Sequence, residues 1–362
     1  MSRSFYRATL LSALLAASSV GLASCKKKSS GPEPSNAGST QAATVSSGKQ
    51  PFPDNAPIVD PPAPTAAPGN PLLGAKLFVD PESLAMLQAN RFRASDPAKA
   101  ALFDKIAQQP QGLWMGEWNT NIFRAVEHFV NRAKAASAVP IVIAYNIPLR
   151  DCGQYSQGGM SSKEGYQRWI RNVAAGIGSD AAVVILEPDA LGHFQECLSD
   201  QQKADRLAML NDAVRVLRQN PHTAVYLDAG HPRWQPAEEM AKRLTAAGVQ
   251  HANGFSLNVS NYVGTEENLA YGHKLSELVG GKHFVIDTSR NGAGPYEQAK
   301  TEEEKWCNPP GRKIGLPPTT NTNDALVDGF LWLKRPGESD GQCRGGPKAG
   351  VWWEEQALDL VR

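Results

Sequence analysis

The chain of 362 residues lacks the features that mark several large classes of protein. No Gly-rich phosphate-binding fingerprint follows its first apolar segment, no two histidines lie at helical spacing, and no Asp-rich calcium loop occurs. These absences argue against nucleotide binding and against a metal centre. The formal net charge is only +1, so nothing indicates a nucleic-acid partner. We therefore expect no cofactor, no metal ion and no nucleic acid.

Long apolar runs are scarce too, and the one that stands out lies at the amino end. Arg3 and Arg7 precede an apolar stretch over residues 8–22 that is too short and too rich in Ala and Ser to span a bilayer. This pattern predicts a targeting segment over residues 1–24. The stretch ends in Leu-Ala-Ser-Cys and resembles a bacterial lipoprotein signal, which implies that Cys25 carries lipid; an ordinary secretory peptide is the alternative. We expect an exported protein that is either anchored to the cell envelope, on the outer surface or in the periplasm, or secreted.

Residues 25–72 show no apolar periodicity and are rich in Lys, Ser, Gly, Pro, Ala and Thr. This composition predicts a flexible to semi-extended tether. The segment is too polar and too poor in aromatic residues to fold as a separate module. We therefore place the folded domain at residues 73–362.

Short apolar segments alternate with amphipathic helical patterns from Pro71 onward. With 41% hydrophobic residues, the chain can bury a large core. The pattern predicts seven strands in a parallel α/β barrel, with a doubly wound open sheet as the alternative. The predicted strands are Leu77–Asp80, Ile141–Asn146, Val183–Leu186, Ala224–Asp228, Phe255–Val259, Phe284–Asp287 and Phe330–Leu333.

Polar side chains gather where these segments end, most clearly after Leu186. Four apolar residues in a row are followed abruptly by Glu187 and Asp189, and Pro188 between them ends the ladder of hydrogen bonds. Further acids follow other predicted strands; they are Asp151, Asp228, Asp287 and Asp340. Because the carboxyl ends of parallel strands meet on one face of a barrel, we predict a site at that rim. The alternative is that each strand simply ends in solvated acids.

Cysteine is scarce, with five residues in total, of which Cys25 is assigned to the lipid. The remaining four are an even number in an exported chain, which predicts two disulfides. Spacing alone does not choose among the three pairings. We favour Cys152–Cys197, because both cysteines lie a few residues beyond predicted strand ends on the same rim. By the same argument we favour Cys307–Cys343, which flank the region of the sixth and seventh predicted strands and the loop of Asp340.

Several carboxylates on one face, with tryptophan nearby, point to hydrolysis of a glycosidic bond. The leaving oxygen needs a protonated acid, and a water or a second carboxylate must attack from the other side. Tryptophan faces pack against the axial hydrogens of sugar rings, and the chain has eight tryptophans. Metal binding is the competing use of such acids, and the missing histidine pair argues against it.

At this point several segments resemble glycoside hydrolase family 6, the inverting cellulases. The resemblance covers about residues 74–362 and keeps the order of the family's motifs. It implies a distorted seven-stranded (β/α) barrel, in agreement with the seven predicted strands. The segments that carry it are 145–152, which ends in Arg-Asp-Cys, 186–189, 227–231 with Trp234, 258–262, Asp287 with Arg290, 306–308 and 334–341.

The resemblance implies catalytic roles for individual residues. Asp189 matches the general acid, and we expect crowding by Asp151 to keep it protonated. Asp340 matches the proposed base, which is disputed in the family and is also thought to act through a chain of waters. An inverting enzyme leaves roughly 6.5–9.5 Å between acid and base. Tyr145 and Ser156 match residues that strain the sugar and place water, and Asp228 matches a further carboxylate of the site.

Substrate contacts follow from the same resemblance; they are Trp114, His231, Trp234, Asn258, Trp306, Lys334 and Glu338. Simpler roles remain open for some residues. Asp228 can be a helix cap or an ion-pair acid, and His231 can fix loop geometry. Glu187 suits a structural partner of a buried base, and Trp352 and Trp353 suit core positions.

Loop lengths favour one subclass. The segments 151–166 and 340–351 are short, whereas family members that cut from chain ends cover the site with long loops. We therefore predict an open cleft and a monomeric endo-β-1,4-glucanase that cleaves internal bonds of cellulose or a related β-glucan. The alternatives are a cellobiohydrolase and a non-catalytic surface glucan-binding protein. The presence of Asp151, Asp189 and Asp340 argues against the latter.

Overall fold

The computed structural model describes residues 48–64 and 69–362. The predicted targeting segment, the lipid site at Cys25 and part of the predicted tether lie outside the described residues. The described residues belong to a single folded unit. Within the described part of the chain, no helix is both long enough and apolar enough to cross a membrane.

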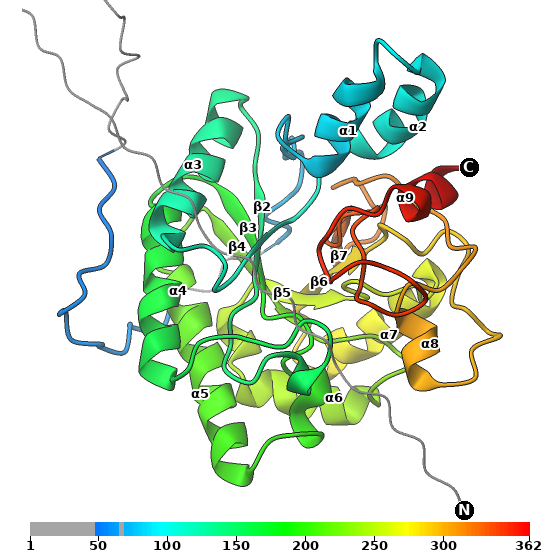
Figure 1. Ribbon diagram of the computed structural model, residues 1–362. Coiled ribbons are helices and arrows are strands. Elements are labelled where there is room, and N and C mark those ends of the chain that lie inside the picture. Colours follow the sequence, from blue (N-terminus) through cyan, green and yellow to red (C-terminus); the bar gives the residue numbers. More distant parts are fainter. Residues whose placement is uncertain (1–47, 65–68) are drawn as a thin grey trace, which may run out of the picture. The chain divides into compact units, whose positions relative to one another are not determined.

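Seven parallel strands form one sheet in the order in which they occur along the chain (Figure 1). They are β1 (Leu113–Met115), β2 (Ile141–Ala144), β3 (Ala182–Leu186), β4 (Thr223–Asp228), β5 (Gly254–Leu257), β6 (His283–Asp287) and β7 (Val327–Leu331). Most of their side chains are apolar and buried, as in parallel sheets that are covered on both faces. The sequential order excludes a doubly wound sheet, in which the strand order reverses partway across.

The sheet curls until its two edges approach each other without pairing as strands. Gly112 donates its N–H to the carbonyl of Trp332 at 2.8 Å, and Trp114 Nε1 donates to the carbonyl of Leu333 at 3.0 Å. A Cβ at position 112 would lie 2.8 Å from the Leu333 carbonyl oxygen, so glycine permits this close approach. The predicted distorted seven-stranded barrel is confirmed.

One predicted strand is wrong, and one strand was not predicted. Residues 77–80 make only a single bridge, from Leu77 to Val139. The first strand of the sheet is β1, which has three residues and lies between Gly112 and Gly116. Its apolar signal is too short to stand out from the surrounding helices. The other six predicted strands match β2 to β7 to within a few residues at their ends.

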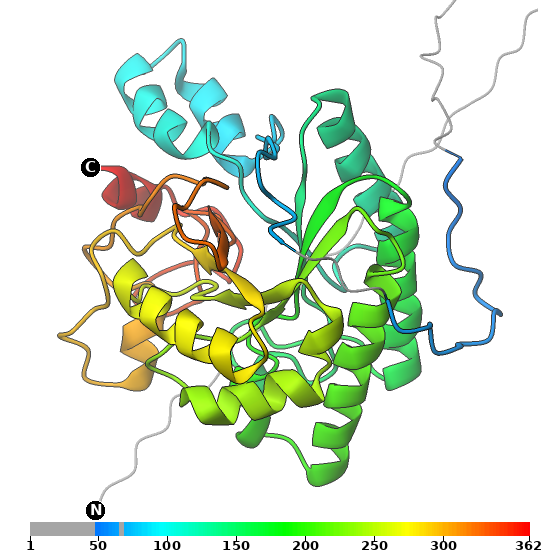
Figure 2. The same cartoon turned by 180° about the vertical axis from the view of Figure 1, so that it is seen from behind.

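Helices cover the outer face of the sheet, and three more gather beside its β7 edge (Figure 2). The outer helices are α3 (Ile122–Ala135), α4 (Lys163–Ile177), α5 (Asp200–Leu217), α6 (Ala237–Ala246) and α7 (Thr265–Leu278). The group of three consists of α1 (Leu84–Phe92), α2 (Pro97–Ala107) and α9 (Glu354–Val361), which pack with Trp332 and Trp352. The short elements are α8 (Glu302–Trp306) and the 3-10 turns η1 (Asp151–Gly153), η2 (Gly192–Gln195) and η3 (Val249–His251).

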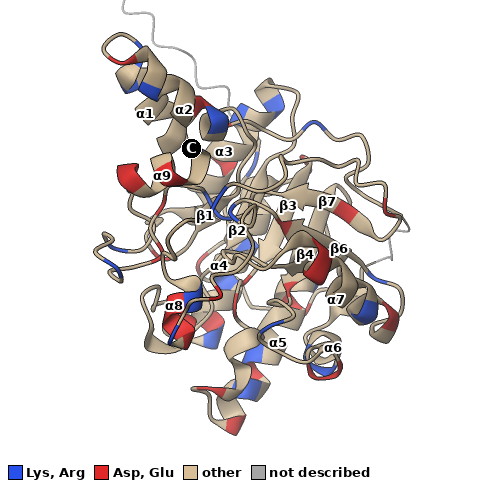
Figure 3. Ribbon diagram, turned by 90° about the vertical axis from the view of Figure 1, so that its right-hand side faces the viewer, with Lys and Arg blue, Asp and Glu red and all other residues tan. Residues whose placement is uncertain are grey.

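The outer helices are amphipathic, and α5 illustrates why they form. A capping box between Ser199 and Gln202 begins the helix. Leu210, Val214 and Leu217 recur at helical spacing and are buried against the sheet. Lys and Arg lie among Asp and Glu on the exposed faces of α5, α6 and α7 (Figure 3). Each helix therefore buries one face and keeps the other in water.

Side chains along each strand alternate between two cores. Ile143, Ile185 and Val285 belong to a cluster inside the barrel. Their neighbours Val142 and Val184 belong to a larger cluster between the sheet and the outer helices. Each strand is therefore packed on both faces, which fixes where its carboxyl end lies.

Part of the predicted tether packs on the domain. Residues 48–64 run beside α4, where the N–H of Phe52 donates to Asn172 at 3.0 Å and Arg171 donates to the carbonyl of Val59 at 2.9 Å. Leu72 is 2% exposed and belongs to the cluster inside the barrel. In these residues the predicted tether lies in an extended form on the domain, because polar side chains of α4 bind its backbone.

Candidate active site

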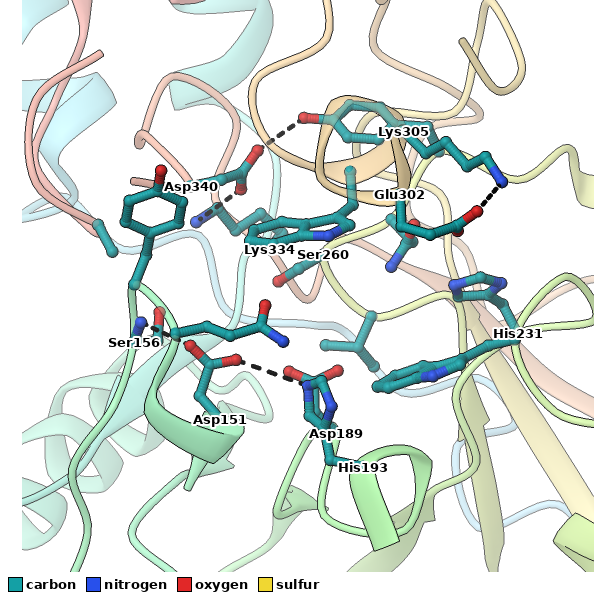
Figure 4. A pocket seen from close by; sticks show the side chains of 18 of the residues that line it. Asp151, Ser156, Asp189, His193, His231, Ser260, Glu302, Lys305, Lys334 and Asp340 are labelled. Atoms are coloured by element: carbon teal, nitrogen blue, oxygen red, sulfur yellow. Dashed lines mark hydrogen bonds and ion pairs between the residues drawn. The ribbon is translucent and has the colours of Figure 1, made fainter. Parts of the chain in front are cut away.

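A pocket of about 1110 Å³ lies where the carboxyl ends of the strands meet. That volume is at the upper end of the range for small-molecule sites and suits an extended ligand. Figure 4 shows Asp151 and Asp189 on one side of the pocket and Lys334 and Asp340 on the other. All predicted site residues except Asp228 and Asn258 line it; they are Trp114, Tyr145, Asp151, Ser156, Asp189, His231, Trp234, Trp306, Lys334, Glu338 and Asp340.

Asp189 follows β3 in a left-handed backbone conformation with φ of 68°. Its N–H donates to Asp228 Oδ2 at 3.0 Å, and its carbonyl accepts the N–H of His193 at 3.0 Å. These bonds hold a conformation that non-glycine residues adopt at a cost. Within the described ranges, no hydrogen bond reaches its carboxyl oxygens. The carboxyl group is therefore available to a ligand in the pocket.

Burial is the main reason why Asp189 keeps its proton. Burial, followed by the negative charges of Asp228 and Asp151, raises the pKa of Asp189 to about 8, against an opposing contribution from His193. The expectation that crowding by Asp151 is the main cause is therefore wrong. A carboxyl group with this pKa is protonated at neutral pH and can donate a proton.

Asp228 lies beneath the pocket and does not line it. It is 2% exposed, and its carboxylate accepts the N–H groups of Asp189 at 3.0 Å and Gly230 at 3.2 Å and the hydroxyl of Ser256 at 3.3 Å. Burial raises the pKa of Asp228 to about 6. The prediction that Asp228 is a catalytic carboxylate is corrected, because this side chain positions Asp189 and does not reach the pocket.

The loop after β2 brings Asp151 beside Asp189. Asp151 Oδ2 accepts the N–H of Ser156 at 2.7 Å. Asp151 Oδ1 lies 3.6 Å from His193 Nε2, and His193 Nδ1 lies 2.6 Å from Glu196 Oε2. The imidazole of His193 therefore lies between two carboxylates, and Figure 4 shows it beside Asp151 at the wall of the pocket.

Two disulfides fasten the loops around the pocket. Cys152 bonds to Cys197, and Cys307 bonds to Cys343, as predicted. The first bond ties the loop that carries Asp151 to the loop that follows Asp189. Cross-links of this kind restrict the unfolded chain and hold the two loops in register.

Buried polar side chains beneath the pocket fix the loops after β2 and β3. Glu187 is 1% exposed and accepts the N–H groups of Asn146 and Ile147 at 2.8 and 2.9 Å. Arg206 on α5 donates to the carbonyl of Ala190 at 3.1 Å and to the carbonyls of residues 148 and 149 at 2.8 and 3.0 Å. Glu187 is structural, as expected: its backbone partners are amides, and the buried bases Arg206 and Arg150 lie close enough to interact with its charge.

Asp340, on the opposite side, is surrounded by donors. Arg290 Nη1 lies 2.9 Å from each carboxylate oxygen, Lys334 Nζ lies 3.4 Å from Oδ1, and the Tyr262 hydroxyl and the Asn308 N–H donate at 2.9 and 3.1 Å. Burial favours the neutral acid, but Arg290 and Lys334 outweigh it and lower the pKa of Asp340. Asp340 is therefore ionised and is a weak proton acceptor.

Lys334 and Glu338 extend this side of the pocket. Lys334 Nζ donates to the carbonyl of Ser339 at 3.3 Å, and burial lowers the pKa of Lys334. Glu338 is 4% exposed and pairs with Arg335 at 3.1 Å. Both side chains keep polar atoms at the pocket wall, where hydroxyl groups of a ligand would meet them.

Residues 337–341 have the Gly-x-Ser-x-Gly spacing of a serine-hydrolase elbow. Ser339 is fully buried, and its hydroxyl bonds to the carbonyls of Gly341 and Pro347, both at 3.0 Å. The segment enters a loop, whereas the elbow requires a strand followed by a helix. Ser339 is therefore not placed as a nucleophile.

Aromatic side chains line both ends of the pocket. Trp114 packs edge-on against Tyr145 with ring centroids 5.0 Å apart, and burial raises the pKa of Tyr145 well above its ordinary value. The ring centroids of Trp306 and Tyr155 lie 6.1 Å apart. The Tyr155 hydroxyl donates to Glu303 on α8 at 2.8 Å. The loop after β2 therefore contacts α8. This contact joins two parts of the pocket wall, although the loop after β2 is short.

Trp234 is held by its neighbours on several sides. The centroid of its ring lies 4.7 Å from that of His193 and 5.8 Å from that of His231. Gly192 permits this packing, because a Cβ there would lie 2.3 Å from the indole. Burial lowers the pKa of His231 to about 4, so this histidine is neutral at the pocket wall.

Asn258 does not reach the pocket. It is fully buried in a left-handed conformation, donates to the carbonyl of Asp287 at 2.9 Å and accepts the N–H of Val263 at 3.1 Å. The prediction that Asn258 contacts substrate is corrected, because both ends of its amide bind backbone. Asn261, three residues later, lines the pocket instead. The turn between β5 and Asn261 points the first asparagine inward and the second toward the cavity.

Several polar residues of the pocket wall were not predicted, among them His193, Glu196 and Asn261. His193 and Glu196 stand between Asp189 and Cys197, beyond the end of β3. That position was the available signal, since residues after strand ends face the rim of a barrel.

Comparisons with known proteins agree with this geometry. The model of the Glycosyl hydrolases family 6 matches residues 72–362. Endoglucanase A of Cellulomonas fimi is 42% identical over 288 residues, which are 79% of this chain and 60% of that protein. Endoglucanase 1 of Streptomyces halstedii is 42% identical over 296 residues, which are 78% of this chain and 88% of that protein. The chain thus spans less than two thirds of the first relative.

Solved structures give the same result. Endoglucanase Cel6 from Mycobacterium tuberculosis, in complex with a methyl-cellobiosyl-4-deoxy-4-thio-β-D-cellobioside, is similar with a TM-score of 0.76 and 46% identity. The match covers 81% of this chain and 98% of that one. Endoglucanase Cel6B from Humicola insolens is similar with a TM-score of 0.70 and 28% identity, over 81% of this chain and 98% of that one.

Proposed function

The chain belongs to glycosyl hydrolase family 6, and from that premise we propose that it is a monomeric endo-β-1,4-glucanase. It cleaves internal bonds of cellulose or a related β-glucan with inversion at the anomeric carbon. The observation that carries the proposal is the environment of Asp189, a carboxyl group in an extended pocket whose pKa is raised to about 8.

Asp189 acts as the general acid. Its carboxyl oxygens carry no protein hydrogen bond among the described residues, so its proton is free to pass to the glycosidic oxygen as the bond breaks. Asp228 holds the backbone of Asp189 from below, and Asp151 adds negative charge beside it. Negative charge in this region also favours the oxocarbenium-like transition state.

A water molecule completes the inverting reaction from the other face of the sugar. Asp340 is held by four partners and is a weak base, so we propose that it takes up the water's proton through further water and not by direct contact. Ser156 and Tyr145, both at the pocket wall, place the water and the distorted sugar. Trp114, Trp234 and Trp306 stack on sugar rings, while Lys334, Glu338 and His231 bind hydroxyl groups.

The Asp189→Ala variant tests the acid directly. We expect turnover on carboxymethylcellulose to fall by about 10³-fold or more, because general acid catalysis contributes about 10²–10⁴-fold. Binding of cello-oligosaccharides should persist. The matched control is Asp200→Ala, at the fully exposed start of α5, which should keep its activity. An unchanged rate in Asp189→Ala would remove Asp189 from its role, and a wild-type protein that binds glucan without cleaving it would favour a binding protein.

Cleavage from chain ends is the second candidate, and the contact from Tyr155 to Glu303 favours it, because this contact joins two parts of the pocket wall. Viscosity distinguishes the two modes. An endoglucanase should lower the viscosity of carboxymethylcellulose early, before much reducing sugar appears. A slow fall in viscosity with mostly cellobiose released would contradict internal cleavage.

We also propose that the protein is exported and carries lipid on Cys25. The two disulfides support export, since such bonds persist in oxidising compartments. Labelling with radioactive palmitate should mark the wild-type chain and not the Cys25→Ser variant. Equal labelling of both would exclude this anchor.

A further inference from the structure

His193 is a pocket residue to which the reaction described above assigns no role. It lies in η2, four positions after Asp189, and is 8% exposed. Both ring nitrogens face carboxylates, with Nε2 3.6 Å from Asp151 Oδ1 and Nδ1 2.6 Å from Glu196 Oε2. An imidazole can donate from both nitrogens only as the cation. The geometry therefore matches a positive charge between two negative ones.

The surroundings of His193 fix this arrangement from several sides. The disulfide from Cys152 to Cys197 joins the residue after Asp151 to the residue after Glu196. Because this disulfide occupies the nearby sulfur of Cys152, no thiolate is available there for a metal ion. Glu196 also accepts a hydrogen bond from Trp234 Nε1 at 3.4 Å, and the edge of the His193 ring packs against the same indole.

We propose that His193 is a positioning residue, which holds the Asp151 carboxylate in place beside the general acid and, with Glu196, orients Trp234. The inference rests on the proposed glucanase function. His193 touches the reacting atoms only through Asp151, so it is not itself a catalytic residue. It links the proton-transfer side of the pocket to one sugar-stacking tryptophan.

The charges around His193 define the expected pH effects. The charged and titratable groups near it are Asp151 after β2, Asp189 after β3, Glu196 in the same loop, His231 across Trp234, and Arg243 of α6, which donates to the carbonyls of Leu191 and Gly192. Although burial opposes it, the bond to Asp151, the charge of Asp189 and the bond to Glu196 raise the pKa of His193 to about 9. Loss of this cation should make Asp189 harder to ionise, because the charge of His193 lowers the pKa of Asp189.

The first experiment measures kcat against pH for His193→Gln, with His222→Gln as the matched control. His222 is an exposed histidine between α5 and β4, outside the pocket. In His193→Gln we expect kcat to fall about tenfold, within the hundredfold that a 1 Å misplacement can cost. The alkaline limb of the profile should move to higher pH by about half a unit to one unit. A profile that superimposes on that of the control would overturn the proposal, since a merely structural role lowers the rate without moving the limbs.

The second experiment needs no activity. The seven histidines are titrated by NMR in isotope-labelled protein, and sequential resonance assignment identifies the signal of His193. In Asp151→Asn, the midpoint of His193 should fall by about one unit, because one of its two anionic partners is gone. An unmoved midpoint would refute the pairing, even if His193→Gln fails to fold. If the wild type cleaves no glucan, the proposed function is wrong. The titration still tests the pairing of His193 with Asp151, because it does not depend on activity.

Discussion

The two sides of the pocket hold carboxylates in opposite electrostatic environments. Asp189 and Asp340 both lie at the rim of the barrel, and burial pushes both toward the neutral acid. On one side the neighbours of Asp189 include the anions Asp228 and Asp151, and its pKa rises to about 8. On the other side Arg290 and Lys334 surround Asp340, and its pKa falls. The sign of the neighbouring charge decides which carboxylate keeps a proton, because burial alone acts alike on both.

The difference is also one of hydrogen bonding. Asp340 receives donors from Arg290, Tyr262 and Asn308, whereas no donor among the described residues reaches the carboxyl oxygens of Asp189. One side therefore provides a fixed negative charge, and the other provides a carboxyl group that can react. An inverting hydrolase needs this asymmetry, since its two carboxylates start the reaction in different protonation states.

Removing Arg290 should have the largest effect on this asymmetry. In Arg290→Met, the buried Asp340 loses its main partner, so the free energy of unfolding should fall by about 3–5 kcal/mol at pH 7. Urea unfolding measures the change. Arg124→Met on α3 is the control, because Arg124 pairs at the surface with its side chain 67% exposed, where ion pairs contribute little. Equal losses in both variants would show that the ion pair of Asp340 is not what stabilises this side.

Neutralising Asp228 should have an intermediate effect on the acid side. In Asp228→Asn the negative charge below Asp189 is lost, so the pKa of Asp189 should fall and the alkaline limb of kcat should move down by about one pH unit. The loss of rate should be about fivefold at pH 8, approach about tenfold at higher pH, and shrink toward pH 6, where Asp189 is protonated again. The limb belongs to a coupled pair, so the measured shift describes the pair.

Asp328→Asn is the control for this prediction. Asp328 is also a fully buried carboxylate, but it lies near the start of β7 and binds Tyr226 and His283 inside the barrel. Its loss should lower stability and leave the alkaline limb in place. If both variants move the limb equally, the effect is a general consequence of altering a buried acid and not of the contact between Asp228 and Asp189.

Much of the fold could be predicted because β2 to β6 have short apolar runs that end in polar residues. β1 could not, because three residues between glycines carry too little pattern. Its position depends on the close approach of Gly112 to the last strand, which is a tertiary contact. The pairing of Cys152 with Cys197 could be predicted, because both lie a few residues beyond the ends of the neighbouring strands β2 and β3.

The site was harder to predict at the level of single side chains. Asp189 and Asp228 both end a strand, yet one faces the pocket and the other lies beneath it. Left-handed turns at Asp189 and Asn258 reverse the alternation that a strand would continue, so the sequence does not reveal which residue points inward. This is why Asn258 was predicted in the place that Asn261 occupies. The raised pKa of Asp189 depends first on burial, which no local pattern reports.

The smallest expected effect concerns the stability cost of the acid side. At pH 7, Asp189→Asn should be more stable than the wild type by about 1–3 kcal/mol. This gain is smaller than the free energy that corresponds to the full pKa shift of Asp189, because the side chain is partly exposed to solvent. The unfolded carboxyl ionises near pH 4, and the folded one near pH 8, so wild-type stability declines as the pH rises between these values. The asparagine variant has no such decline, and its advantage should vanish below about pH 4. Melting temperatures from pH 4 to 9 measure it. Asp340→Asn should lower the stability at pH 7, because it removes a carboxylate whose pKa is lowered by its ion pairs with Arg290 and Lys334. If both variants are less stable than the wild type at pH 8, the two sides do not differ in the way that their charges imply.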